Sequence, residues 1–308
     1  MHSDSSENSV MESPAGSNKK AGDSVEHIDD SRDVMWASLN FTNSIVGAGL
    51  IGMPYAIEKC GFLVGIVMMV VIAFIVRHSV ILLIDCGLKL NALDLEVLAG
   101  KVMGKYGYFV ALGAMFVYAY GAQIAYMVII GDTLPVVLQS IFPEAEINRN
   151  VVIVTAATCI VLPLCLLKSI ASLSYASGIS IFANIILVII VCIRGPIAEH
   201  ERHINEVNGD FELSNSSLFA GIGAMSFTFV CQHNSFLIFR SLRNPTRENW
   251  YRVATNAMSF ALFVCMIMGV AGYLSFFDFT KGNILNDFSY KGTIWLAGFV
   301  TVHCVHLL

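Results

Sequence analysis

Long uncharged apolar runs recur along the sequence, and they constrain its fold more than any other feature. A helix needs about 20 apolar residues to cross the hydrocarbon core of a bilayer. Residues 34–57 and 106–131 contain no Asp, Glu, Lys or Arg, and comparable runs follow. We predict eight membrane spans, the last incomplete, at 34–57, 62–84, 106–131, 150–167, 169–193, 213–239, 253–277 and 292–308.

The composition agrees with a membrane protein. Hydrophobic residues make up 56% of the chain and charged residues only 13%, whereas soluble domains carry about 25% charged residues. Backbone groups in lipid must be hydrogen-bonded internally, so the spans are predicted to be helices and the fold class all-α. A net charge of −5 gives no sign of nucleic-acid binding, so the expected partners are the lipid bilayer and a small molecule.

Charge also divides the chain and orients it. Residues 1–32 are polar and lack apolar periodicity, which predicts a disordered cytoplasmic tail before a membrane domain at 33–308. With the N-terminus inside, 11 Lys and Arg residues fall on the cytoplasmic side and 6 on the other, as the positive-inside rule requires. Asn215 begins an Asn-Ser-Ser triplet beside the outer loop 195–212 and is a candidate glycosylation site.

The first span carries residues that disfavour a continuous helix. Gly47, Gly49, Gly52 and Pro54 fall near its middle, and Gly and Pro both weaken helix interiors. An interruption would free amides that suit a carboxylate and carbonyls that suit a cation or an ammonium group. The alternative is a face of small residues that lets two helices pack closely.

The sixth span favours the first of these interpretations. It begins with Gly221 and Gly223 and then carries a polar patch at residues 226–235. Interrupted spans at corresponding positions of two halves indicate a transporter site. Spans 1 and 6 lie five spans apart, as an inverted repeat of five plus five requires.

Several strings of residues resemble one known family. These are FTNSIVGAGLIGMPY at 41–55, GDTL at 131–134, MSFTF at 225–229 and HNSFL at 233–237. Together they resemble the sodium-coupled neutral amino acid transporters over residues 35–302. The resemblance implies the leucine-transporter fold of the amino acid/polyamine/organocation superfamily, an inverted repeat with discontinuous spans 1 and 6. That fold has ten core helices, so we expect a version truncated at about eight spans.

The resemblance also implies a function and a site. It implies alternating-access symport of a small neutral amino acid, no enzymatic activity, no organic cofactor, and sodium as the coupling ion. The amides of Ala48 and Gly49 would hold the substrate carboxylate. The full set of expected substrate-binding residues is Ser44, Gly47, Ala48, Gly49, Phe227 and Thr228. The expected sodium ligands are Asn43, the Val46 carbonyl and Thr301.

Other interpretations remain open at this level. An amino-acid sensor could use the same fold without transport, and proton coupling could replace sodium coupling. His233 is predicted to be a hydrogen-bonded core histidine, with a proton site as the alternative. Arg77 lies within span 2 and is predicted to pair with Asp85, eight residues further on. The protein could reside in the plasma membrane or in a lysosomal or vacuolar membrane.

The charge count yields a prediction about topology. A tag at the N-terminus should be cytosolic, and a tag inserted within 196–212 should lie outside the cell or in the lumen. Protease protection of the two tags measures this directly. If a protease added to one side of the membrane cleaves both tags, the predicted orientation is contradicted.

Overall fold

Helices make up the regular structure throughout the part of the chain that is described. The computed structural model describes residues 33–142, 144, 146–162, 171–201, 217–277 and 280–287. Within these described ranges, three helices are long and apolar enough to cross a membrane, or four if a bent pair at the N-terminal end is counted as one span. The all-α class is therefore confirmed within these ranges, while the eight-span count stays a prediction. The predicted tail 1–32, Asn215, Thr301 and the eighth span 292–308 lie outside the described residues.

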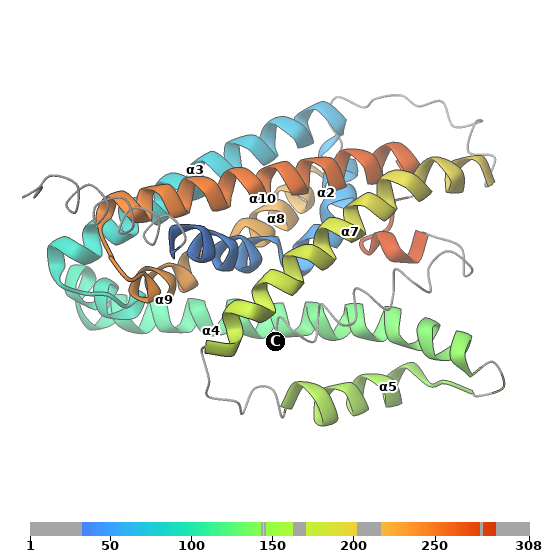
Figure 1. Ribbon diagram of the computed structural model, residues 1–308, viewed down its shortest axis with the longest axis horizontal. Helices are drawn as coiled ribbons and strands as arrows, with labels where there is room; N and C mark the ends of the chain where they lie inside the picture. The colour runs from blue at the N-terminus through green and yellow to red at the C-terminus, as the bar shows by residue number, and fades with distance from the viewer. Residues whose placement is uncertain are drawn as a thin grey trace, which may run out of the picture.

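The longest helices form the frame of the molecule. They are α3 (Phe62–Leu90), α4 (Leu95–Ile141), α7 (Ala171–Glu201) and α10 (Arg247–Phe276). Helices α3 and α10 lie side by side, α7 crosses α10, and α4 runs along the opposite side of the bundle (Figure 1). The shorter α5 (Arg149–Ala156) and the π-helical turn η2 (Ala157–Val161) follow α4 and pack against it. This arrangement leaves room between α4 and the α3–α10 pair for the interrupted helices.

The first apolar run is a bent pair of helices. A helix over Asp33–Val46 and a second over Gly49–Cys60 meet at an angle of 49°. The joint is the 3-10 helix η1 (Ala48–Gly52), which leads into α2 (Met53–Cys60). Pro54 occupies the second position of α2, where its missing N–H costs no helical hydrogen bond. The Gly-rich sequence thus changes the helix type where span 1 was expected to be interrupted.

The sixth apolar run is also divided. Helix α8 (Leu218–Phe229) ends at Val230, whose ψ of 115° is extended. Helix α9 (Gln232–Ser241) begins after Cys231. The interruption thus falls inside the polar patch of this span.

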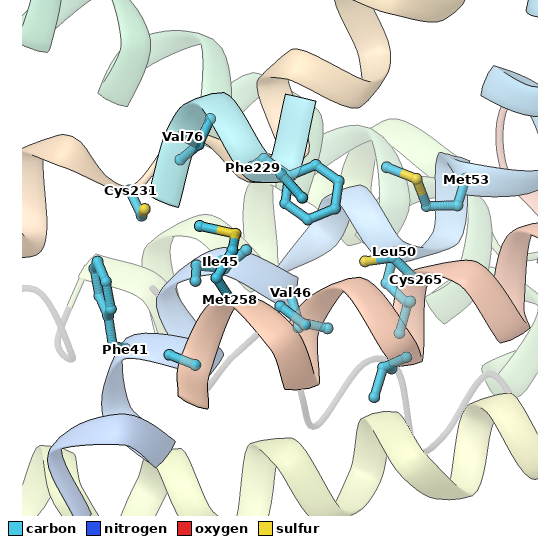
Figure 2. Packing of buried hydrophobic residues seen from close by; sticks show 14 of the residues in the cluster. Phe41, Ile45, Val46, Leu50, Met53, Val76, Phe229, Cys231, Met258 and Cys265 are labelled. Atoms are coloured by element: carbon cyan, nitrogen blue, oxygen red, sulfur yellow. The ribbon is translucent and has the colours of Figure 1, made fainter. Parts of the chain in front are cut away.

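A continuous apolar core surrounds both interruptions. Figure 2 shows Phe41, Ile45 and Val46 before the bend, together with Met258 and Cys265 of α10. Trp250 of α10 is fully buried, and its ring centroid lies 5.2 Å from that of Phe41. The indole N–H of Trp250 donates to the carbonyl of Val80 at 3.1 Å. This aromatic cluster fastens the first helix, α3 and α10 together on the side that is predicted to be cytoplasmic.

The intramembrane arginine has a different partner from the one predicted. Arg77 donates twice to the hydroxyl of Thr255, at 2.8 and 3.1 Å, and its guanidinium lies 4.9 Å from the Tyr251 ring. Asp85 instead forms a bidentate pair with Arg247 at 2.7 Å. The predicted Arg77–Asp85 pair is therefore wrong. Both side chains are held by α10, because that helix packs along α3.

Candidate functional site

The two interruptions meet where Gly49 lies against Thr228. A Cβ atom added to Gly49 would fall 2.6 Å from Cβ and 2.7 Å from Cγ2 of Thr228. Real Cβ atoms do not approach other atoms so closely, so only glycine fits here. The Thr228 hydroxyl donates to the Ala224 carbonyl at 3.0 Å, which fixes its rotamer. The first helix and α8 are therefore in direct contact at the level of their breaks.

A small cavity of about 30 Å³ lies at this junction. A space of this size holds about one or two water molecules. The structure brings five of the six expected substrate-binding residues around it, and Ala48 lies in η1 between two of them. The cavity is lined by Ser44, Ile45, Gly47, Gly49, Tyr118, Ala122, Tyr126, Phe227 and Thr228. The site is closed tightly around the break in this conformation.

Backbone polarity at the break suits ions of both signs. A helix leaves its first N–H groups without internal partners, so the N-terminal amides of η1 suit an anion. Of the last carbonyls of the helix Asp33–Val46, that of Asn43 accepts from the Gly47 amide at 3.4 Å. The ones after it follow the general rule that a helix leaves its last C=O groups without internal partners. Asn43 and Val46, two of the expected sodium ligands, are buried in this last turn. The third, Thr301, lies outside the described residues.

Two tyrosines of α4 complete the cavity, and the sequence interpretation missed both. The Tyr118 hydroxyl donates to the Val230 carbonyl at 3.2 Å, which satisfies a group freed by the interruption of the sixth run. The Tyr126 hydroxyl lies 3.1 Å from the position of a Cβ on Gly47. Tyr118, Ala122 and Tyr126 follow one another at four-residue spacing, which places them on one face of a helix. This four-residue spacing of two tyrosines within an otherwise apolar run could have identified both residues from the sequence.

The polar patch of the sixth run contributes contacts to the first. The Asn234 side-chain amide donates to the Ser44 hydroxyl at 3.0 Å. The His233 ring lies 4.9 Å from the Tyr118 ring, but its buried Nδ1 has no hydrogen-bond partner among the described residues. The prediction of a hydrogen-bonded core histidine therefore finds no partner at Nδ1, and for the ring as a whole it stays a prediction. The histidine packs against the tyrosine that bonds the broken backbone.

A larger cavity adjoins the small one. Its volume is about 510 Å³, and it shares Gly49, Phe227 and Thr228 with the small cavity. We call it the vestibule. It is lined further by Ile51, Gly52, Ala125, Val128, Ile129, Asp132, Ala224, Lys281, Gly282, Asn283 and Asn286. Asp132 and Lys281 are on the side that the charge distribution predicts to be outside, so the vestibule leads from that side to the junction.

Interrupted helices that meet around a cavity in an apolar helical bundle define a class of membrane transport proteins. The chain belongs to the transmembrane amino acid transporter family, whose family model matches residues 31–308. The family and the relatives described next are transporters rather than enzymes.

Three relatives illustrate the similarity. Vacuolar amino acid transporter 2 of Saccharomyces cerevisiae is 34% identical over 86% of this chain and 57% of its own length. A mouse protein provisionally named sodium-coupled neutral amino acid transporter 11 is 32% identical over 82% of this chain and 56% of its own length. Its human counterpart is 31% identical over 75% and 57%. The chain thus spans a little over half the length of these relatives.

The close approach of Gly49 to Thr228 predicts second-site suppression. Gly49→Ala should destabilise the protein by about 1–3 kcal/mol, because the new methyl group overlaps Thr228. In a Thr228→Gly background the overlapping atoms are gone, so the same substitution should cost much less. Melting of the four purified proteins measures this coupling.

Gly223→Ala is the control for this cycle, because a Cβ at Gly223 of α8 meets no atom within 4 Å. It should change the melting temperature little in either background. If Gly49→Ala lowers the stability equally in the wild-type and Thr228→Gly backgrounds, the contact between the two broken helices is contradicted.

Proposed function

We propose that this protein is a secondary transporter of neutral L-amino acids that works by alternating access and is coupled to sodium. One observation carries the proposal. Two broken helices of an amino acid transporter family member meet at a cavity lined by Ser44, Gly47, Gly49, Phe227 and Thr228. Amides beside that cavity suit the substrate carboxylate, and carbonyls suit cations.

The lining of the small cavity supports a neutral substrate. Hydroxyl groups come from Ser44, Thr228 and the two tyrosines, and Phe227 supplies an aromatic face. None of the residues that line this cavity in the described chain carries a charge. A charged substrate side chain would lose its hydration there without a partner, which is costly in a low-dielectric site. A small neutral side chain avoids that cost.

Alternating access has a basis in the asymmetry of contacts around the junction. On the predicted outer side the vestibule reaches Gly49. On the other side, two hydrogen bonds hold the first helix in place. The Asn234 side-chain amide donates to the Ser44 hydroxyl, and the Arg243 backbone amide donates to the Asp33 carboxylate at 2.8 Å. We infer that this conformation faces outward, and that release on the other side requires these contacts to part.

Sodium coupling rests on Asn43 and the Val46 carbonyl, which lie within one turn of the break. Proton coupling is the second candidate, favoured by His233 with its unbonded Nδ1 beside Tyr118. A sensor that binds amino acids without carrying them is the remaining alternative. The names of the relatives include both a vacuolar and a sodium-coupled transporter, so residence in the plasma membrane or in a vacuolar or lysosomal membrane fits the proposal.

Uptake under imposed ion gradients tests this function. Proteoliposomes that contain the purified protein should accumulate labelled neutral amino acids from a panel, and replacement of sodium by choline should abolish the accumulation. Empty liposomes are the control. Uptake that persists in choline and rises with an inward proton gradient would reverse the choice of ion, and binding without any uptake would indicate a sensor.

A further inference from the structure

Arg77 places a positive charge within the apolar length of α3, and no acidic residue in the described part of the chain pairs with it. Its Nε and Nη2 atoms both donate to the hydroxyl of Thr255 on α10, at 3.1 and 2.8 Å. That hydroxyl donates in turn to the Tyr251 carbonyl at 2.7 Å. A guanidinium group carries five N–H donors, and a hydroxyl brings no charge. The contact with Thr255 therefore leaves Arg77 with unused donors and an unbalanced charge.

The acidic residues of α3 and α10 are paired with other arginines. Asp85 forms its bidentate pair with Arg247. Glu248 accepts from Arg252 at 2.8 Å. Together the two helices carry four Lys and Arg residues against two Asp and Glu residues. An anion that does not belong to these helices can therefore balance the charge of Arg77 without displacing an ion pair.

The surface beside Arg77 is apolar and exposed. Val70, Phe74 and Arg77 follow one another at spacings of four and three residues, which places them on one face of α3. Val70 is 45% exposed and Phe74 is 62% exposed. The Tyr251 ring lies 4.9 Å from the guanidinium of Arg77 and is 50% exposed. Such a surface suits lipid acyl chains, which are as apolar as the side chains they contact.

The depth of Arg77 suits a lipid head group. Its contact Tyr251 lies on α10 between two exposed charged residues, Glu248 and Arg252. Charged side chains at the end of an apolar run lie at the membrane surface, and a long arginine side chain extends toward that surface. This end of α10 is on the side that the charge distribution predicts to be cytoplasmic, where membranes carry most of their anionic phospholipids.

We propose that Arg77 binds the phosphate of an anionic phospholipid, with Tyr251 beside the head group and the acyl chains along Phe74 and Val70. A guanidinium group can donate to two phosphate oxygens in parallel. A lipid with a net negative charge balances Arg77, whereas a zwitterionic lipid brings a cation of its own. The bound lipid spans α3 and α10, which lie side by side (Figure 1).

This site is independent of the proposed transport activity, because none of its residues lines the small cavity or the vestibule. Its failure would leave the proposed function intact, and the binding measurement below involves no amino acid.

Native mass spectrometry of the delipidated protein in detergent measures lipid binding. Wild-type protein should retain a single dioleoylphosphatidylserine molecule per chain and should bind dioleoylphosphatidylcholine about 10-fold more weakly. Arg77→Gln should weaken phosphatidylserine binding about 10-fold or more, because a charge-assisted contact is lost. Arg77→Lys retains the charge and guards against a failure of the first variant to fold. It should weaken binding several-fold, because an ammonium group lacks the planar fork of donors.

Arg252→Gln is the matched control, because it removes the same charge at the same level of α10 from an arginine that is already paired with Glu248. It should change phosphatidylserine binding little. Equal losses for Arg77→Gln and Arg252→Gln would indicate general attraction to a basic surface and would overturn the site. Equal binding of the two lipids by the wild type, or wild-type affinity in Arg77→Lys, would also overturn it. Inorganic phosphate should not displace the lipid, and displacement would contradict a lipid as the ligand.

Discussion

The structure depends on one constraint: backbone N–H and C=O groups inside a membrane must find partners in the protein. Two apolar runs break their helices at membrane depth, and each break is accommodated differently. At the first, η1 shortens the hydrogen-bond spacing, so that the Leu50 amide donates to the Gly47 carbonyl at 3.4 Å. At the second, the Tyr118 hydroxyl donates a hydrogen bond to the Val230 carbonyl, which has no helical partner. Under the proposed function, the backbone groups that remain at the junction would bind the substrate.

Packing around the breaks explains why they persist. Gly49 allows the first helix to touch Thr228, and larger residues would force the two helices apart. On the predicted cytoplasmic side of the junction, the Trp250 ring of α10 packs against Phe41 of the first helix, and its indole N–H donates to the Val80 carbonyl of α3. On the predicted outer side, the vestibule is lined by α4 and by the segment that carries Lys281. Within the described residues, the protein is therefore tightly packed on one side of the junction and hollowed on the other, as the proposed alternating access requires.

The sequence predicted those features that one helix determines by itself. Glycine and proline content located the first break, and the polar patch at residues 226–235 located the second. Features that depend on packing between helices were not predicted. Spacing along α3 suggested Asp85 as the partner of Arg77, but Arg77 donates to Thr255 because α10 packs beside α3. Tyr118 and Tyr126 were not singled out from the sequence, because their role depends on the packing of α4 against both breaks. The role of Thr301 as a sodium ligand stays a prediction, because this residue lies outside the described ranges.

Counterflow of a labelled amino acid in proteoliposomes tests the central claim, that the substrate passes between the two breaks. Gly47→Val is the decisive variant, because Gly47 lines the cavity and a Cβ there meets only the hydroxyl end of the Tyr126 side chain within 4 Å. Gly223→Val is the control, since it adds the same side chain where no atom lies within 4 Å. With equal amounts of folded protein, wild type and Gly223→Val should accumulate label and Gly47→Val should not. Counterflow by Gly47→Val at the wild-type rate would contradict the site.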